Sequence, residues 1–528
     1  MEKVFNMGKA SAMGSVQLLV GVAASTIIMA VGTIVLTRLM SPAEYGLYAI
    51  ALVPSLMISL FRDWGVNSAM TKYIANLRAA NKEERIHDVI VAGIIFEVAT
   101  GLVLSFLSVF LANLVASAIF HRPESTFFIS VVSVTIISGS LLTVSQSCFV
   151  GFERMELNSS VVICQSIVKT TVGPLLVLFG YGVLGAVLGY TVSFLAAGII
   201  GVVLLYVTLF RPLKESDVKR SELSKTLKEM LKYGMPLSIS SILTGALVGF
   251  YSFMMAYSVS DIMIGNYQAA ANFAVLLTFI TNPISTVLFP AFAKLDPKKE
   301  RQLLRTVFTS SIKYASMLLV PVTMAMMALS GPMISTLFGE KYVYAPFFLT
   351  LYIIGNLFTV LGNLSLSSFL TGLGETKIRM KQSILTLSIG IPMGLFLIPM
   401  FGILGLILAA LLANLPSMFW GLLWTWKHYQ AAADFKSSAK ILLASTVATI
   451  ATYLFLSFLN TVDWMRLIAG GAIFLAVYIV TAPMIGAITQ TDVGNLRTVL
   501  SGLGIVSRMF NALLILIEKV AEHVRAHV

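Results

Sequence analysis

Runs of about twenty apolar residues recur along this chain, and short basic segments separate them. A helix needs about 20 apolar residues to cross the hydrocarbon core of a bilayer. The runs predict about fourteen spans, which begin near residues 14, 46, 89, 126, 159, 183, 235, 267, 314, 347, 383, 403, 441 and 465. Only 11% of the residues are charged, whereas a soluble domain carries roughly 25%. The sequence therefore predicts an all-α polytopic membrane protein and excludes a large soluble helical protein.

The distribution of lysine and arginine predicts how these spans are oriented. Thirty of the 36 basic residues fall in segments that face the same side as the N-terminus. Four fall in the opposite connections, namely Arg38, Arg122, Lys341 and Arg466. The other two, Arg62 and Lys169, lie within predicted spans. Because cytoplasmic loops carry the excess of Lys and Arg, both termini are expected in the cytoplasm, with the spans in a plasma or inner membrane. The net charge of +12 follows from this pattern, so no nucleic-acid partner is expected.

An internal repeat at an offset near 220 residues divides the chain. The letters GLYA at 46–49 resemble GNYQA at 265–269, and GVLG at 182–185 resembles GILG at 402–405. Six spans per copy give both copies the same orientation, which is typical of transporters whose ligand path lies between parallel repeats. We therefore expect two pseudo-symmetric six-helix lobes plus two extra helices. The predicted parts are an N-lobe (1–210, spans 1–6), a basic cytoplasmic linker (211–234), a C-lobe (235–426, spans 7–12), spans 13 and 14 (440–487) and an amphipathic cytoplasmic tail (490–528).

Several short motifs resemble those of a known transporter family. The stretch RLMSPAEYGLY at 38–48 resembles the connection between the first two helices of polysaccharide-type flippases, and DWG at 63–65 resembles the end of their second helix. GNY at 265–267 and LFPAF at 288–292 resemble their eighth helix, and 331–342 resembles the exit of their ninth. These flippases belong to the multidrug, oligosaccharidyl-lipid and polysaccharide exporter superfamily.

The resemblance implies a function and its partners. It implies that the protein moves a polyprenyl phosphate or diphosphate oligosaccharide from the cytoplasmic to the outer leaflet by alternating access of the two lobes. The expected partners are this lipid-linked oligosaccharide, membrane lipids and a coupling ion, either a proton or sodium. The motifs do not name the sugar.

Charged residues inside spans are the candidate site residues, because each costs at least about 2.5–3.5 kcal/mol at the bilayer centre. Arg62 and Asp63 lie late in span 2, Glu97 in span 3 and Lys169 near the middle of span 5. We expect Arg62 and Lys169 to bind substrate phosphates, since Arg grips phosphate bidentately and Lys acts as a point charge. Asp63 and Glu97 would balance these charges or couple an ion. In the alternative interpretation, the four form buried ion pairs that only fix helix packing.

The sequence shows no signature of catalysis. No Gly-x-x-x-x-Gly-Lys-[Ser/Thr] phosphate loop is present, and the five histidines form no metal-ligand grouping. We therefore expect neither a cofactor nor a metal, and not an enzyme. Two alternative functions stay open. One is a multidrug or cation antiporter of the same fold; the other is a membrane polymerase or ligase of polysaccharide assembly, which would need a larger outer loop than the longest one predicted, roughly Asn113 to Ser125.

Overall fold

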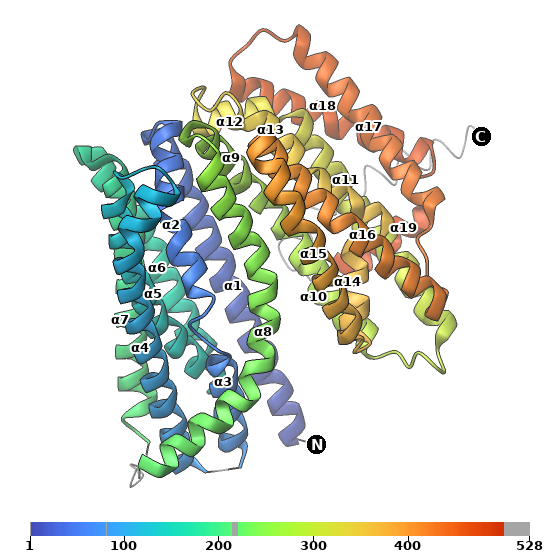
Figure 1. The fold of residues 1–528 in the computed structure, drawn as a ribbon. Helices are drawn as coiled ribbons and strands as arrows, with labels where there is room; N and C mark the ends of the chain where they lie inside the picture. Colours follow the sequence, from blue (N-terminus) through green and yellow to red (C-terminus); the bar gives the residue numbers. More distant parts are fainter. Residues whose placement is uncertain (1, 81, 214–219, 501–528) are drawn as a thin grey trace. The chain divides into compact units, whose positions relative to one another are not determined.

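The computed structural model describes residues 2–80, 82–213 and 220–500 (Figure 1). Across these residues the secondary structure is helical and no strand occurs, which confirms the all-α prediction. The helices form two compact units. The first unit comprises residues 1–268 with 394–406, and the second comprises residues 269–393 with the chain from 407 onward. Much of the predicted tail, 501–528, lies outside the described residues.

Eight long helices and three π-helical segments build most of the first unit. They are α1 (Glu2–Leu39), α2 (Pro42–Ser59), α3 (Val66–Ala79), α4 (Glu83–Asn113), η1 (Leu114–Ile119), α5 (Ser125–Gly151), α6 (Met155–Leu176), η2 (Val177–Tyr181), α7 (Gly182–Leu205), η3 (Tyr206–Phe210) and α8 (Arg220–Ser258). The next helix, α9 (Asp261–Ala274), begins in this unit.

The remaining helices belong wholly or largely to the second unit. They are η4 (Val275–Leu277), α10 (Thr278–Ala293), α11 (Arg301–Ala328), α12 (Ser330–Phe338), α13 (Ala345–Ile353), η5 (Ile354–Leu361), α14 (Asn363–Gly372), α15 (Thr376–Phe401), α16 (Ile403–Tyr429), α17 (Phe435–Phe458), α18 (Asp463–Met484) and α19 (Gln490–Leu500). The boundary between the units passes through α15 and α16.

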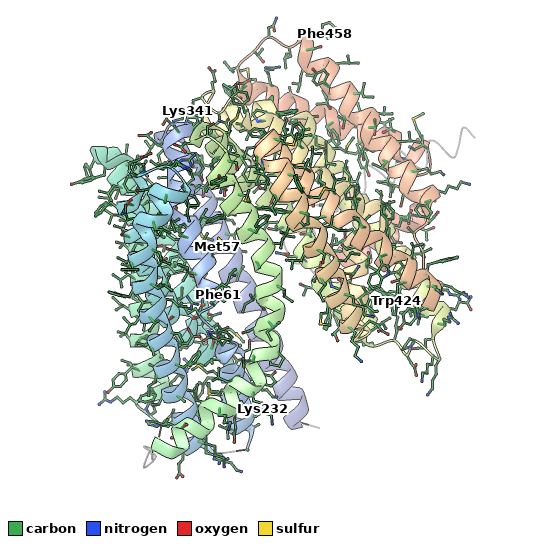
Figure 2. The ribbon with its side chains drawn as sticks, viewed as in Figure 1. Met57, Phe61, Lys232, Lys341, Trp424 and Phe458 are labelled. Atoms are coloured by element: carbon green, nitrogen blue, oxygen red, sulfur yellow. The ribbon has the colours of Figure 1, made fainter. Side chains whose placement is uncertain are left out.

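Small residues let the helices of the first unit approach closely, as expected where lipid removes the hydrophobic drive between helices. The hydroxyls of Ser25 on α1 and Ser166 on α6 lie 2.5 Å apart. A methyl group at Gly249 on α8 would lie 3.2 Å from Met57 of α2, whose position Figure 2 labels. These contacts hold α1 against α6 and α2 against α8.

The two predicted extra helices, α17 and α18, pack against α11 in the second unit. Their shared core contains small residues, Ala444 and Ala448 on α17, and two aromatic rings, Phe474 and Tyr478 on α18, all buried. Phe458 ends α17 and is 84% exposed (Figure 2). The hairpin is thus anchored along one face, and its tip is open.

The predicted number of fourteen spans is not confirmed. Eleven stretches of the described chain are long and apolar enough to cross a membrane, or twelve if the bent pair Ala345–Leu361 and Asn363–Gly372 forms one span. One of the eleven, Met155–Phe210, has 56 residues, or ~84 Å of helix at 1.5 Å per residue. It breaks at Gly180, where φ is +90°, and α6 and α7 on either side of the break pack together. Fourteen therefore stays a prediction.

More than half of the predicted linker is a helix that packs on protein. α8 begins at Arg220, continues without interruption into the membrane-spanning part, and bends part-way along its length (Figure 1). Met230 is fully buried in the core of the first unit, and Leu223, Leu227 and Leu231 pack against the same core. The apolar stripe of this segment therefore faces neighbouring helices, which the sequence pattern alone could not distinguish from a lipid surface.

Candidate functional site

The candidate site lies at a break in a helix. The sequence predicts Arg62 and Asp63 inside span 2, but α2 ends at Ser59 and the chain becomes helical again only at Val66. Trp64 and Gly65 both have positive φ, +47° and +78°, a conformation that glycine adopts readily and tryptophan rarely. Non-helical backbone at membrane depth is tolerated where protein surrounds it or where it lines a cavity. The break therefore presents both charged side chains to neighbouring helices.

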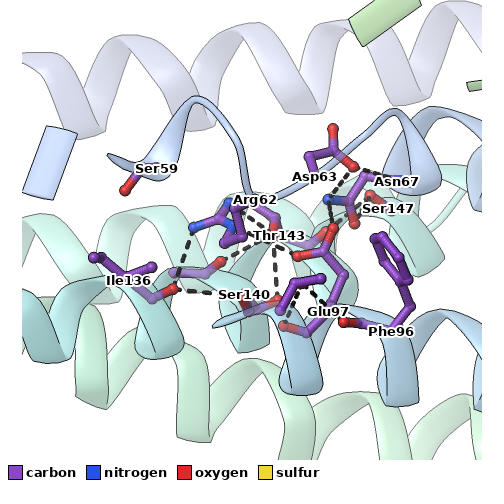
Figure 3. A network of polar contacts seen from close by, with 12 residues as sticks. Ser59, Arg62, Asp63, Asn67, Phe96, Glu97, Ile136, Ser140, Thr143 and Ser147 are labelled. Atoms are coloured by element: carbon purple, nitrogen blue, oxygen red, sulfur yellow. Dashed lines mark hydrogen bonds and ion pairs between the residues drawn. The ribbon is translucent and has the colours of Figure 1, made fainter. Parts of the chain in front are cut away.

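Arg62 reaches across to α4 and α5 (Figure 3). Its Nε lies 3.5 Å from Oε2 of Glu97 on α4. Its terminal nitrogens donate to the Ile136 carbonyl at 3.4 Å and to the Thr143 hydroxyl at 3.2 Å. Hydrogen bonds between a guanidinium and a carboxylate are typically about 2.7–2.9 Å long, so these contacts are long. The buried Nε of Arg62 and Oε2 of Glu97 make no hydrogen bond within the described structure.

Asn67 joins the two carboxylates of the cluster. Its side-chain nitrogen donates to Asp63 Oδ1 at 2.9 Å and to Glu97 Oε1 at 2.8 Å. Its backbone N–H also donates to Asp63 Oδ1, at 2.9 Å, which satisfies an otherwise free amide at the start of α3. The Ser147 hydroxyl of α5 donates to the side-chain oxygen Oδ1 of Asn67 at 3.2 Å. One amide thus fixes two acidic groups relative to each other (Figure 3).

Lys169 lies apart from this cluster. It is fourteen residues beyond the start of α6 at Met155, or ~21 Å along the helix axis. Its Nζ lies 5.1 Å from the ring centroid of Tyr190 on α7, within the range of a cation–π interaction. No carboxylate within the described residues forms an ion pair with it.

The structure brings three of the four predicted residues together. Glu97 pairs with Arg62, and Asn67 links Asp63 to Glu97. Three neighbouring residues connect Arg62 to Lys169. A methyl group built on Gly139 would meet both Arg62 Nη1 and the Phe194 ring. The ring centroid of Phe194 is 5.0 Å from that of Tyr190, the aromatic neighbour of Lys169. Whether the two cations serve one ligand stays a prediction.

Sequence reasoning missed several residues of the cluster. Asn67 carries no charge, and Thr143 and Ser147 are only two of many hydroxyl residues on α5. A usable signal was the density of Ser and Thr in that helix, because hydroxyls in a span need partners. Within the described residues, no group of three or more His, Cys, Asp or Glu side chains is arranged to hold a metal ion.

Sequence reasoning also missed Arg122, which it treated only as an outer-loop charge. This residue lies in the connection between α4 and α5, and it contacts the connection between α8 and α9. Its Nε lies 2.5 Å from Asp261 Oδ1, and its terminal nitrogens donate to the carbonyls of Ala256 and Val259, each at 2.6 Å. One guanidinium thus satisfies the carboxyl end of α8 and ties two connections together.

Comparison with known proteins places this fold. The structure aligns with that titled "Lipid II flippase MurJ, inward closed conformation" with a TM-score of 0.72, at 16% identity, over 89% of this chain and 98% of that one. Uncharacterized membrane protein MJ1068 of Methanocaldococcus jannaschii is 22% identical over 377 residues, 69% of this chain and 73% of that protein. Succinoglycan biosynthesis transport protein ExoT of Rhizobium meliloti is 24% identical over 322 residues, 59% of each chain.

The structural likeness at this identity concerns the fold alone, which this chain shares with that structure. Two of these proteins are named for transport or for lipid flipping. The family described as "Polysaccharide biosynthesis protein" matches residues 12–296, more than half of the sequence. The chain therefore belongs to this family of polysaccharide biosynthesis proteins.

Proposed function

We propose that this protein moves a polyprenyl phosphate or diphosphate oligosaccharide from the cytoplasmic to the outer leaflet of the cell membrane. The observation that carries the proposal is Lys169, a cation deep in a membrane helix with an aromatic neighbour and no carboxylate partner within the described residues. A charge at such a depth costs several kcal/mol, so a residue kept there is by default part of a transport path. A phosphate group is the ligand charge that would offset this cost.

Arg62 supplies the second phosphate contact in this proposal. Its hydrogen bonds are long and its Nε makes none within the described structure. A phosphate oxygen could replace the Glu97 carboxylate as the partner of Arg62 at little cost in free energy. Bidentate contacts between arginine and phosphate are shorter and stronger than the contacts that Arg62 makes in this structure. Asp63 and Glu97 then balance the cation when substrate is absent, or bind the coupling ion, a proton or sodium.

Alternating access is part of the same proposal. The two six-span repeats would form the lobes, with the substrate path between them, and rocking of one lobe against the other would expose the path to each side in turn. Arg122 and Asp261 belong to different copies of the predicted repeat, and both lie in connections predicted to be outside. Both residues lie in the first unit, so their contact joins these two connections within that unit.

The charge distribution favours this function over the antiporter alternative. A carrier of cationic drugs would need an available carboxylate in its path, but Glu97 is fully buried, paired with Arg62 and hydrogen-bonded to Asn67. Lys169 lies well inside α6 and forms no ion pair within the described residues, which suits an anionic ligand. A polymerase or ligase would need a large outer connection. The longest one predicted, Asn113 to Ser125, is shorter in the structure, because η1 continues the helix to Ile119.

Deletion of the gene followed by mass spectrometry of membrane lipids tests the proposal. Polyprenyl-linked oligosaccharide should accumulate and return to normal when the wild-type chain is restored. An unchanged lipid profile together with new sensitivity to cationic drugs would contradict the proposal and favour the antiporter.

A further inference from the structure

An open cavity of about 680 Å³ lies within the second unit, and no residue of the cluster around Arg62 lines it. It is lined by the end of α11, by α12 and the start of α13, and by the tip of the α17–α18 hairpin. Small-molecule sites usually have volumes of about 300–1,000 Å³, so the cavity can hold a ligand of several rings. Lys341 and Phe458, both labelled in Figure 2, mark the two connections beside it.

The charged groups of the cavity leave a hydrogen-bond donor available. Arg466 at the start of α18 contacts Asp463 Oδ1 at 3.3 Å and the Leu456 carbonyl at 3.4 Å, both long for a guanidinium. Its Nε is buried and makes no hydrogen bond within the described structure. The Arg466 side chain as a whole is 34% exposed. A ligand with an acceptor oxygen could therefore replace these long contacts with shorter hydrogen bonds.

Acidic groups outnumber basic ones in the cavity lining. Glu340 and Asp463 contribute two carboxylates against the single guanidinium of Arg466, which Asp463 already neutralises. A phosphate or other anion would meet a net negative surface here. The described residues hold no cluster of three metal-ligating side chains. The charges therefore disfavour an anion, and the described residues offer no ligand set for a metal ion.

Hydroxyl groups and an aromatic ring complete the lining. Thr350 donates to Ser330 Oγ at 3.2 Å, and Ser335 donates to the Gly331 carbonyl at 3.0 Å, so both donors keep an oxygen that can accept. Tyr453 on α17 also lines the cavity and is 68% exposed. Sugars present hydroxyls that both donate and accept, and the C–H face of their rings packs on aromatic side chains. Carboxylates, hydroxyls, a guanidinium with only long hydrogen bonds and an exposed tyrosine match this chemistry.

We propose that this cavity binds neutral sugar units of an oligosaccharide on the outer side of the membrane. The proposal rests on the proposed flippase function and on the predicted topology, which places both flanking connections outside. In this role the extra hairpin, α17 and α18, provides a place for the glycan as it leaves the membrane. The cavity would then contribute to the selection of sugar structure, a task for which Lys169 and Arg62 are unsuited because they contact phosphate.

Gly331 offers a way to fill the cavity without disturbing the fold. It lines the cavity within α12, and a methyl group built on it meets no other heavy atom within 4 Å. A phenyl side chain at Gly331 therefore has room to occupy the cavity. Gly494 on α19 has equally open surroundings and does not line the cavity. Gly331→Phe and Gly494→Phe are thus a matched pair.

The test uses the full chain in lipid nanodiscs and saturation-transfer NMR. The probe is the mixture of soluble, lipid-free oligosaccharides released by mild acid from the source cell's own surface polysaccharide. Signal transfer to sugar ring protons is expected for the wild-type protein and for Gly494→Phe. It should fall at least fivefold in Gly331→Phe and Tyr453→Ala, and inorganic phosphate at millimolar concentration should not compete.

Three results would overturn the inference: no transfer with wild-type protein, equal transfer with Gly331→Phe, or displacement by phosphate, which would indicate an anion site. Failure here is distinguishable from failure of the proposed function, because the probe carries no lipid phosphate. A protein that flips lipid-linked oligosaccharide but does not bind the free glycan would refute glycan binding in the cavity and leave the proposed flippase function standing.

Discussion

Arg122 and Asp261, 139 residues apart in sequence, meet at 2.5 Å between Nε and Oδ1. The same guanidinium also donates to the nearby Phe120 carbonyl at 2.9 Å and to the Ala256 and Val259 carbonyls at the end of α8, each at 2.6 Å. Hydrogen bonds to a charged group contribute about 1.5–3 kcal/mol each when buried. We predict that Arg122→Ala raises amide exchange in residues 256–262 at least tenfold, measured by hydrogen–deuterium exchange mass spectrometry.

Arg122→Lys is the control for this effect. The lysine ammonium can replace one of the contacts of Arg122 but not all those that the planar guanidinium makes at once. Amide exchange in residues 256–262 should therefore rise less in Arg122→Lys than in Arg122→Ala. Equal exchange in wild type and Arg122→Ala would show that the contact does not hold the two connections together.

Gly139 on α5 leaves the space that the Arg62 guanidinium occupies. A methyl group there would lie 2.5 Å from Arg62 Nη1. We predict that Gly139→Ala displaces the guanidinium and lowers transport at least fivefold while the protein stays folded. Gly173→Ala on α6 is the matched control, because its methyl would meet its nearest neighbour, Gly189, at an ordinary 3.8 Å. Normal transport by Gly139→Ala would remove Arg62 from the proposed path.

The fold class followed from the sequence because one physical constraint, the thickness of the bilayer, sets the length of every apolar run. The number of spans did not follow so simply, since a break after Ser59 interrupts a helix that the hydropathy pattern shows as continuous. Charges in spans pointed to Arg62 and Glu97, whose side chains the structure places 3.5 Å apart. Their neutral partner Asn67 could not be found this way, because contact across 30 residues depends on how α3 and α4 pack.

Asp492 and Lys313 anchor α19 to α11 in the second unit. Lys313 Nζ lies 2.7 Å from both carboxylate oxygens, and Asp492 is 4% exposed. Burial raises the pKa of Asp492, but hydrogen bonds from Lys313 and Thr489 lower it more, so the pKa is below its usual value. A lowered carboxyl pKa stabilises the folded state above the unfolded value of about 3.9, and this contribution is lost as pH falls through the folded pKa.

We therefore predict that Asp492→Asn lowers the Tm at neutral pH, and that the difference from wild type disappears at a pH below the folded pKa of Asp492. Thermal unfolding of the detergent-solubilised protein at several pH values measures this. The double variant Lys313→Met with Asp492→Leu should recover part of the loss, because no unpaired charge remains. A difference that does not change with pH would contradict a role for the carboxylate charge.

The orientation of the chain rests on its basic residues. We predict that reporters inserted in the basic segment from Arg211 to Lys232, or fused after Val528, respond as cytoplasmic. A reporter inserted beside Lys341 should respond as external, because this connection is one of the few predicted outside. The opposite response at any of the three positions would reverse or break the predicted topology.

Lys169 provides the most direct test of the account. Proteoliposomes would carry the full chain and fluorescent polyprenyl-diphosphate oligosaccharide, and a membrane-impermeant quencher would measure the fraction that crosses. Lys169→Ala should reduce the flipping rate at least tenfold without loss of folded protein, Lys169→Arg should keep part of the rate, and Lys294→Ala, an exposed loop residue, should leave it unchanged. Normal flipping by well-folded Lys169→Ala would contradict the account, because substrate phosphate would then cross without the cation in α6.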